Sequence, residues 1–289
     1  MTFVERAWTA PDGLRLSARD YAGADGPARL PVLMIHGLTR NARDFEEVAP
    51  AVAAAGRRVL AVDVRGRGRS AWSPDPASYT PAVYAGDVEA LMVAAGIARA
   101  VCVGTSMGGL ITMTLAAWKP ERVAAAVLND VGPVVGARGL ERILGYAGGT
   151  APVESWADAA AYAARINGPA FPDHGPADWD VFARRLFREG EGGRPELDYD
   201  PGVGAAFAAI PVGPAPDLWP VWDALAAEGR PLLSVRGALS DILEPATVAE
   251  MARRAPQLRR VDVPGVGHAP ALTEPAAREA MAALLAEVD

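Results

Sequence analysis

The stretch AVCVGTSMGGLITMTLAAWK, residues 100–119, decides the fold of this 289-residue chain. It starts as a short apolar run, turns at the pentapeptide GTSMG (104–108) and continues with helix-forming residues until Pro120 ends the helix. A G-x-S-x-G pentapeptide is informative where it joins a strand to a helix, which is its setting here. The sharp turn projects the hydroxyl of Ser106, and the glycines leave room for the neighbouring backbone. The stretch therefore predicts a nucleophilic serine at the N-terminus of a helix.

Outward from this turn, the chain alternates short apolar runs with Ala-rich stretches of helical spacing. The runs expected to form parallel strands are 31–35, 58–64, 100–104, 124–130, 231–237 and 258–265. Continuous apolar runs are typical of strands that are buried on both faces, and their alternation with helices predicts a mostly parallel, doubly wound α/β sheet. The run 13–21 is expected to be an earlier strand, antiparallel at the sheet edge.

The alternation breaks between residues 131 and 225. This segment contains helix-like pieces separated by turns rich in glycine and proline, and it has no strong strand pattern. We therefore expect a helical cap over 131–225, inserted into a core formed by 1–130 and 226–289.

Several aromatic residues fall in the predicted cap. Trp156, Trp179 and Phe182 are candidates for lining an apolar substrate pocket beneath it. The alternative for each of them is ordinary packing between helices, which is the commoner fate of a single aromatic side chain.

A serine hydroxyl needs a base within hydrogen-bonding reach, because it is a poor nucleophile at neutral pH. The chain has three histidines. His268 follows the last predicted strand in a loop with two glycines and is the expected base. His36 lies in the turn after the first apolar run, where we expect it to bind loop backbone, and His174 lies in a cap loop that no strand positions.

The turn after the first apolar run is also the expected source of an oxyanion donor. Gly37 allows the backbone to pass close to the nucleophile. The backbone N–H groups of Leu38 and Met107 are therefore the predicted oxyanion hole.

Six segments together carry a family resemblance. In chain order they are HGLTRNARDF, VDVRGRGRS, GTSMGG, LNDVGP, RGALSDIL and GVGHAP. Their order and spacing resemble the α/β-hydrolase superfamily, in the branch that holds esterases, lactonases, C–C bond hydrolases and haloperoxidase-like perhydrolases. The resemblance implies the α/β-hydrolase fold with a helical cap, and two-step acyl transfer through Ser106. A serine at this position disfavours the epoxide-hydrolase and haloalkane-dehalogenase chemistries, which use a carboxylate nucleophile.

Two acids compete to orient His268. Asp241 and Asp130 each follow a predicted core strand, and both satisfy the chain order Ser…Asp…His. We expect Asp241 to be the acid, because its strand is next in sequence to the strand before His268 and consecutive strands tend to be neighbours. Its position also resembles the place where the family most often carries its acid. Asp130 is the alternative, since some members place the acid after the earlier strand.

Composition narrows the range of partners and functions. The net charge of −7 leaves no basic excess to neutralise nucleic acid or an anionic membrane, and a single cysteine excludes an intrachain disulfide. The sequence shows neither the pattern of a signal peptide nor an apolar segment long enough to span a membrane, so the expected location is the cytoplasm. No metal or nucleotide motif occurs, so no cofactor is expected. The sequence does not determine the oligomeric state.

These observations predict an enzyme that cleaves a small to medium carboxylic ester or lactone. A C–C bond hydrolase or a perhydrolase with the same triad is one alternative. A ligand receptor that keeps the fold but turns over slowly is another, because fold alone does not establish function.

Overall fold

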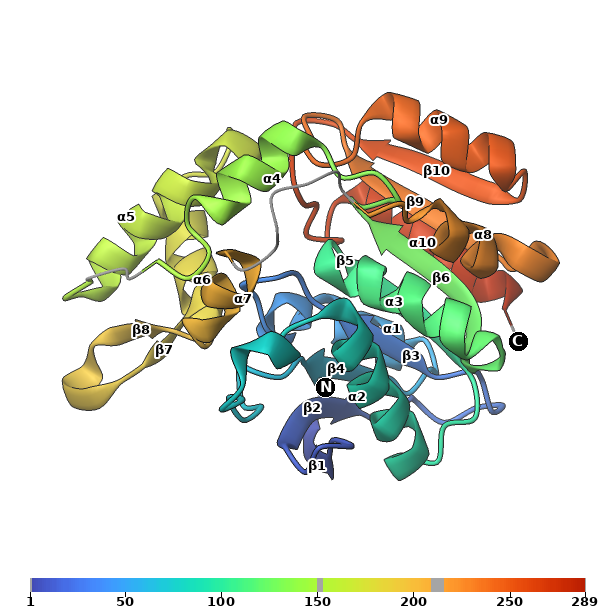
Figure 1. The fold of residues 1–289 in the computed structure, drawn as a ribbon, viewed down its shortest axis with the longest axis horizontal. Coiled ribbons are helices and arrows are strands. Elements are labelled where there is room, and N and C mark those ends of the chain that lie inside the picture. Colours follow the sequence, from blue (N-terminus) through green and yellow to red (C-terminus); the bar gives the residue numbers. More distant parts are fainter. Residues whose placement is uncertain (1, 150–152, 209–215, 289) are drawn as a thin grey trace.

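A computed structural model of the chain describes residues 2–149, 153–208 and 216–288 (Figure 1). Its centre is an eight-stranded sheet in the order β1-β2-β4-β3-β5-β6-β9-β10. The strands are β1 (Val4–Thr9), β2 (Arg15–Tyr21), β3 (Val32–Ile35), β4 (Val59–Asp63), β5 (Ala100–Thr105), β6 (Val123–Asn129), β9 (Leu232–Gly237) and β10 (Leu258–Val263). From β4 to β10 all pairings are parallel, whereas β2 pairs antiparallel with both β1 and β4. The expected mostly parallel sheet is confirmed, and the strand at 13–21 lies second from the edge because β1 covers it.

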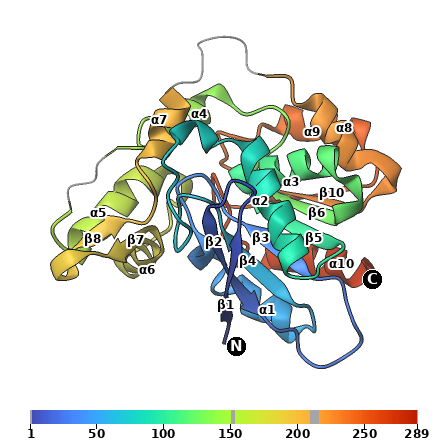
Figure 2. The same cartoon turned by 60° about the horizontal axis from the view of Figure 1, so that its bottom comes forward.

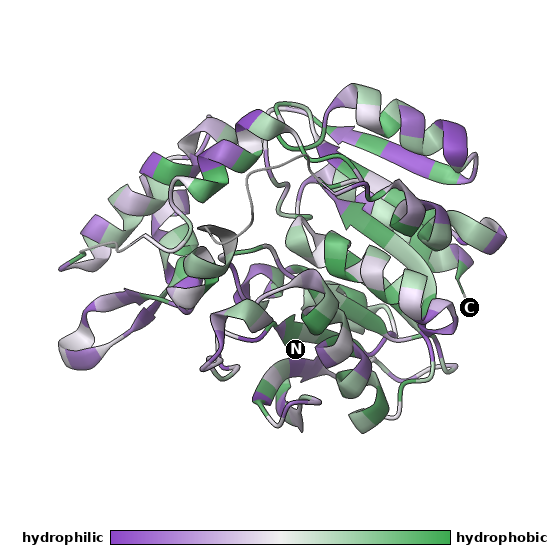
Figure 3. Ribbon diagram, viewed as in Figure 1, coloured by the Kyte–Doolittle hydropathy of each residue, from purple (hydrophilic) through white to green (hydrophobic). Residues whose placement is uncertain are grey.

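The central strands are apolar on both faces because helices cover both faces. Every residue of β3, β4, β6 and β9 is buried. Along β3 the side chains alternate: Leu33 and Ile35 join one hydrophobic cluster, and Val32 and Met34 join the other. Figure 3 shows the same contrast, with hydrophobic central strands and a hydrophilic outer surface on α9 (Pro245–Arg254).

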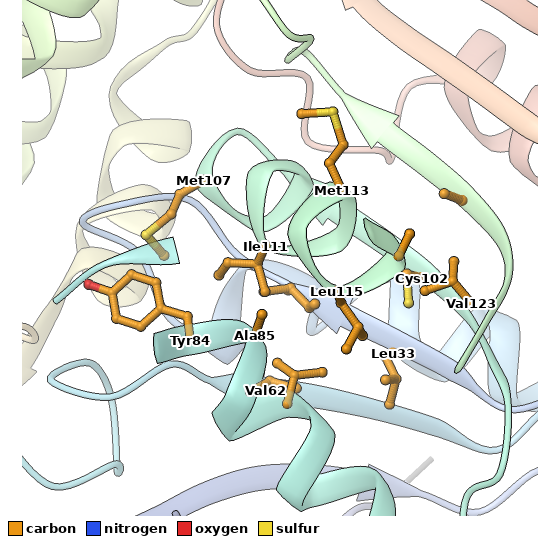
Figure 4. Close-up of a cluster of buried hydrophobic side chains, with 14 of the residues drawn as sticks. Leu33, Val62, Tyr84, Ala85, Cys102, Met107, Ile111, Met113, Leu115 and Val123 are labelled. Carbon is orange, nitrogen blue, oxygen red and sulfur yellow. The ribbon is translucent and has the colours of Figure 1, made fainter. Parts of the chain in front are cut away.

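Two groups of helices form these clusters. Those on the face of Leu33 are α2 (Pro81–Ala94), α3 (Met107–Trp118), α8 (Trp219–Ala226) and α9, and those on the face of Val32 are α1 (Val48–Ala54) and α10 (Pro275–Glu287). Figure 4 shows Ile111 of α3 on the side of Tyr84 from α2, and Leu115 of α3 beside Leu33 and Cys102 of the sheet. The helix that starts after Ser106 is therefore anchored in the larger core cluster.

The segment from α4 to α7, here called the cap, projects to one side of the sheet (Figures 1 and 2). Its elements are α4 (Ala137–Leu144), α5 (Trp156–Asn167), α6 (Pro176–Leu186), the hairpin β7 (Phe187–Glu189) and β8 (Pro195–Leu197), and α7 (Gly202–Ala208). A capping box between Ser155 and Asp158 starts α5, and buried residues of α5 and α6 form a small separate core. Short 3-10 helices are η1 (Ala42–Phe45), η2 (Pro76–Ser78), η3 (Pro120–Arg122), η4 (Gly168–Ala170), η5 (Glu191–Gly193) and η6 (Ala227–Gly229).

The C-terminal boundary predicted for the cap, at residue 225, lies within α8. Trp222 and Leu225 of α8 are fully buried in the cluster that α3 and α9 share. The boundary at residue 225 thus falls inside a helix that packs on the sheet. In the described part of the chain, no helix is both long enough and apolar enough to cross a membrane.

Candidate active site

The turn between β5 and α3 holds Ser106 in a left-handed backbone conformation, with φ 52° and ψ −116°. A Cβ at residue 104 would lie 2.4 Å from the carbonyl carbon of Gly108, and one at residue 108 would lie 2.0 Å from the carbonyl oxygen of Ile35. Only glycine fits at both positions, because backbone cannot move aside as a side chain can. The expected strand-turn-helix setting of Ser106 is present.

Ser106, His268 and Asp130 form a continuous hydrogen-bonded chain. The Nε2 atom of His268 lies 2.9 Å from the Oγ of Ser106, and its Nδ1 atom lies 2.7 Å from Oδ2 of Asp130. Asp130 is fully buried and the His268 side chain is only 8% exposed. This is the geometry in which a carboxylate orients an imidazole so that it can take a proton from a serine.

The structure places Asp130, and not the expected Asp241, beside His268. Asp241 does not reach His268 but forms a bidentate ion pair with Arg142 of α4, at 2.7 Å for each oxygen. Its hydrogen bonds to Arg142 lower the pKa of the Asp241 carboxyl. In this structure the acid beside His268 is Asp130, the alternative that the sequence left open.

Sheet order explains why Asp130 is the closer acid. Strand β6, which Asp130 follows, lies between β9 and β5, the strand that leads into Ser106. The loop after β10 then crosses back over the end of β9, where a Cβ on Gly237 would lie 2.2 Å from the carbonyl oxygen of Gly267. The small residue at 237 lets that loop approach β6, so His268 meets Asp130.

Asn129 joins the strand before Ser106 to the loop that carries His268, a role that no motif in the sequence indicates. The side-chain Nδ2 of Asn129 donates to Oγ1 of Thr105 at 3.0 Å and to the backbone carbonyl of Pro270 at 2.8 Å. The backbone carbonyl of Asn129 accepts the N–H of Ser106 at 2.9 Å. Asn129 is fully buried. The available signal was a single amide side chain at the end of an otherwise apolar buried strand, where a polar group needs partners.

The predicted oxyanion donors belong to segments that meet at Ser106. A Cβ on Gly37 would lie 3.7 Å from the Cβ of Ser106, so the loop after β3 runs against the nucleophile. Arg67 holds this loop through a 2.9 Å hydrogen bond from Nε to the carbonyl of Leu38. Met107 is the first residue of α3, where backbone N–H groups lack partners within the helix. Their role as donors stays a prediction.

A cavity of about 500 Å³ opens beside Ser106 and His268. This volume is in the usual range for small-molecule sites. Its apolar wall combines core and cap residues: Leu38, Phe45, Ile143, Tyr146, Phe171, Val181, Phe182 and Val266. Its rim carries ion pairs, of Arg40 with Asp44 at 2.6 Å and of Arg185 with Glu47. A larger cavity, of about 640 Å³ beside the β7–β8 hairpin, shares no lining residue with it.

The three aromatic candidates take different places. Phe182 lines the cavity, with the guanidinium of Arg40 4.2 Å from its ring centroid. Trp179 lies behind it, with ring centroids 5.7 Å apart. Trp156 packs in the cap core, under the guanidinium of Arg184 at 3.6 Å. His174, which sequence reasoning set aside, is also part of the cavity wall, as are Ile143, Tyr146 and Phe171.

Comparison with known proteins agrees with this geometry. Residues 31–275 match the family model described as the alpha/beta hydrolase fold. The chain belongs to this family. It is 38% identical over 276 residues to the 3-hydroxybutyrate-oligomer hydrolase of Cupriavidus necator, which covers 92% of each chain. It is 30% identical over 240 residues to the 2-(acetamidomethylene)succinate hydrolase of Mesorhizobium japonicum, covering 82% of this chain and 81% of the other.

A solved structure matches this chain over its whole length. The crystal structure of an alpha/beta hydrolase from Novosphingobium aromaticivorans is 48% identical, covers 100% of both chains and superposes with a TM-score of 0.92. Within the described ranges, no group of three or more His, Cys, Asp or Glu residues is arranged to hold a metal ion.

His36 of the hydrolase supports the loop that carries Leu38. Its Nε2 accepts the N–H of Val64 at 3.0 Å, so its Nδ1 carries the proton and donates to the carbonyl of Gly37 at 2.7 Å. This confirms the expected contact with loop backbone. Complete burial lowers the pKa of His36 from 6.5 to about 3, because the charged form is desolvated.

That lowered pKa predicts a pH dependence of stability. Below pH 6.5 the unfolded chain protonates His36 whereas the folded chain does not until about pH 3, so stability is lost as the pH falls through this window. Between pH 7.5 and 4.5 we expect His36 to cost roughly 2–3 kcal/mol of unfolding free energy. Urea unfolding of the wild type and His36→Gln checks this. The wild type is more stable at pH 7.5, and its advantage shrinks by that amount at pH 4.5. An advantage that does not change with pH would contradict the buried neutral imidazole.

Proposed function

We propose that this hydrolase cleaves carboxylic esters through an acyl-enzyme on Ser106. The observation that carries the proposal is the chain from Ser106 Oγ through His268 to Asp130, with contacts of 2.9 and 2.7 Å, beside a cavity of about 500 Å³. A hydroxyl, a base and an orienting carboxylate in this arrangement are the groups that acyl transfer requires.

The reaction has two steps. Ser106 Oγ attacks the ester carbonyl carbon while its proton moves to Nε2 of His268, and the backbone N–H groups of Leu38 and Met107 stabilise the oxyanion. The C–O bond to the alcohol then breaks, and His268 returns the proton to the leaving oxygen. In the second step water attacks the acyl-enzyme, His268 takes its proton, and that proton returns to Ser106 as the acid leaves.

Among esters, we propose short oligomers of a 3-hydroxy acid as the first substrate class to test. The support is the 38% identity to the Cupriavidus necator 3-hydroxybutyrate-oligomer hydrolase over 92% of both chains. The cavity also fits this class, because it joins an apolar wall to a rim of paired charges, and such oligomers alternate methyl-bearing carbons with ester and carboxylate oxygens.

The test compares p-nitrophenyl esters of increasing acyl length with the linear dimer and trimer of 3-hydroxybutyrate. We expect steady turnover of the short p-nitrophenyl esters and release of 3-hydroxybutyrate from both oligomers. A stoichiometric burst without turnover would contradict the esterase and favour the receptor. Turnover of p-nitrophenyl esters without oligomer cleavage would remove the oligomer substrate and leave the esterase.

Replacing Phe182 is expected to change substrate preference, because its ring forms part of the cavity wall. Phe182→Ala should raise KM for the longer p-nitrophenyl esters by roughly 5- to 100-fold, because about 1–3 kcal/mol of apolar contact is lost. Trp156→Ala is the matched control, since Trp156 packs in the cap core beneath Arg184. It should lower the melting temperature and leave the chain-length preference unchanged. Equal preference profiles for both variants would mean that the ring of Phe182 does not contact the acyl chain.

A further inference from the structure

The loop after β9 carries a hydroxyl that the triad alone does not explain. Ser240 lies in this loop, and its backbone N–H donates to the carbonyl of Gly237 at 2.9 Å. Its Oγ lies 2.6 Å from Oδ2 of Asp130. That is the same carboxylate oxygen to which Nδ1 of His268 binds at 2.7 Å.

The direction of the Ser240 hydrogen bond follows from its other partners. Its Oγ also accepts the backbone N–H groups of Ile242 at 3.1 Å and Leu243 at 3.0 Å. Both lone pairs of the hydroxyl are used by these donors, because a hydroxyl has two acceptor sites and one proton. The proton therefore points at Asp130. The two backbone N–H groups orient the hydroxyl as a donor to the carboxylate.

Asp130 thus accepts three hydrogen bonds within a fully buried site. Ser240 and His268 bind Oδ2, and the N–H of Gly237 binds Oδ1 at 2.9 Å. Donors on both oxygens fix the rotation of the carboxylate about its side-chain bonds. They also stabilise its ionised form, because a buried carboxylate without donors would be strongly disfavoured.

We propose that Ser240 is a positioning residue that acts on His268 through Asp130. It holds Oδ2 in line with Nδ1 of the imidazole and shares the negative charge on that oxygen. Nothing in the general acyl-transfer scheme assigns a role to this hydroxyl. The inference rests on the proposed function, since it assigns Asp130 and His268 the roles of acid and base.

The hydrogen bond from Ser240 to Asp130 affects how strongly Asp130 stabilises the protonated imidazole of His268, and the direction of this effect can be predicted. A carboxylate that loses one donor becomes a stronger acceptor for its remaining partner, so it stabilises the imidazolium more strongly. Without the Ser240 hydroxyl, the acidic limb of the kcat/KM profile should therefore move to higher pH. Asp241, with its partner Arg142, interacts electrostatically with His268. The cavity that His268 lines also holds these charged and titratable groups: Arg40, Asp44, Glu47, Tyr146, His174, Asp178, Arg185 and Glu274. All of these are unchanged in a Ser240 variant.

The experiment compares three variants with the wild type on one p-nitrophenyl ester between pH 5 and 9. Ser240→Ala should lower kcat by about five- to twenty-fold with KM nearly unchanged, and should move the acidic limb up by roughly half a pH unit. Ser240→Thr keeps the hydroxyl and should restore both quantities. Ser234→Ala is the matched control: Ser234 is a buried serine of β9 whose Oγ has no hydrogen-bond partner among the described residues. It should change neither.

A purely structural Ser240 predicts a different pattern. Ser240→Ala would then lower the melting temperature while kcat and the acidic limb stay at their wild-type values, and this would overturn the proposal. If Ser240→Ala does not fold, Ser240→Cys keeps the side-chain shape with a weaker donor and should show the same upward shift at smaller size. An unshifted limb in that variant would also overturn the proposal.

A readout without substrate separates this inference from the proposed function. The proton between His268 Nδ1 and Asp130 should give a downfield proton NMR signal at low pH, and Ser240→Ala should move it further downfield as Asp130 becomes the stronger acceptor. If the wild type hydrolyses no ester, the proposed function fails on its own panel. The Ser240 proposal is then decided by this signal, and an identical position in the wild type and the variant would refute it.

Discussion

Ser106→Ala is expected to fold like the wild type and to lose ester turnover by about 10⁴-fold or more. The change removes the hydroxyl that lies 2.9 Å from Nε2 of His268, and with it the group that we propose forms the acyl-enzyme. The measurement is kcat/KM on a short p-nitrophenyl ester, together with the melting temperature. The variant should have a melting temperature close to that of the wild type, because alanine keeps the Cβ atom of serine and occupies the same backbone conformation at a φ of 52°.

Thr114→Ala is the control for this change. Thr114 lies on the same helix, and its hydroxyl donates to the carbonyl of Leu110 at 2.8 Å, away from the triad. Its loss should alter kcat/KM by less than about two-fold. Retention of more than a few per cent of wild-type turnover in Ser106→Ala would mean that another residue is the nucleophile.

Asp130→Asn is expected to lower kcat by about 10²–10⁴-fold, whereas Asp241→Asn should lower it by less than about ten-fold. The amide can no longer stabilise the imidazolium, and it favours the tautomer in which His268 cannot accept the serine proton. Asp241 instead pairs with Arg142, and each side chain is 23% exposed. Breaking that pair should cost on the order of 1 kcal/mol of stability with little effect on chemistry.

Both variants need the same folding check by circular dichroism and thermal unfolding. The larger loss of kcat in Asp241→Asn would contradict the assignment of Asp130, and it would mean that the loop after β9 rearranges when substrate binds. Equal and small losses would show that His268 needs no orienting carboxylate.

The sheet was predictable because its signals are local. Continuous apolar runs such as 31–35 and 58–64 can be buried on both faces only in a sheet that helices cover on each side, as β3 and β4 are. The Ser106 turn was predictable because the strand, the glycines and the helix lie within 20 consecutive residues, 100–119. His268 followed from elimination among three histidines.

Which acid lies beside His268 was not predictable from the sequence, because it depends on the order of strands in space. The expected neighbourhood of β9 and β10 is present, but β6 is the other neighbour of β9, which places Asp130 within reach as well. The outcome then depends on side-chain partners far apart in the sequence. Asp241 forms its hydrogen bonds with Arg142, whereas the N–H of Gly237 and the hydroxyl of Ser240 donate to Asp130. No local pattern encodes those contacts.

The wall of the cavity was only partly predictable for the same reason. Phe182 and Trp156 are both aromatic residues on cap helices, yet one faces the cavity and the other lies under Arg184. The end of the cap predicted at residue 225 lies inside α8, because α8 has helical spacing like the cap helices and its packing against α3 and α9 is not visible in the sequence.

The most direct test of the central claim is the site at which a fluorophosphonate probe reacts. Such a probe forms a covalent adduct with a serine that a neighbouring base has activated. We expect intact-mass measurement to show a single adduct on the wild type, and peptide mass spectrometry to place it on Ser106. Labelling should be much slower in His268→Ala and absent in Ser106→Ala. An adduct on any other residue, or labelling of Ser106→Ala at the wild-type rate, would contradict the account.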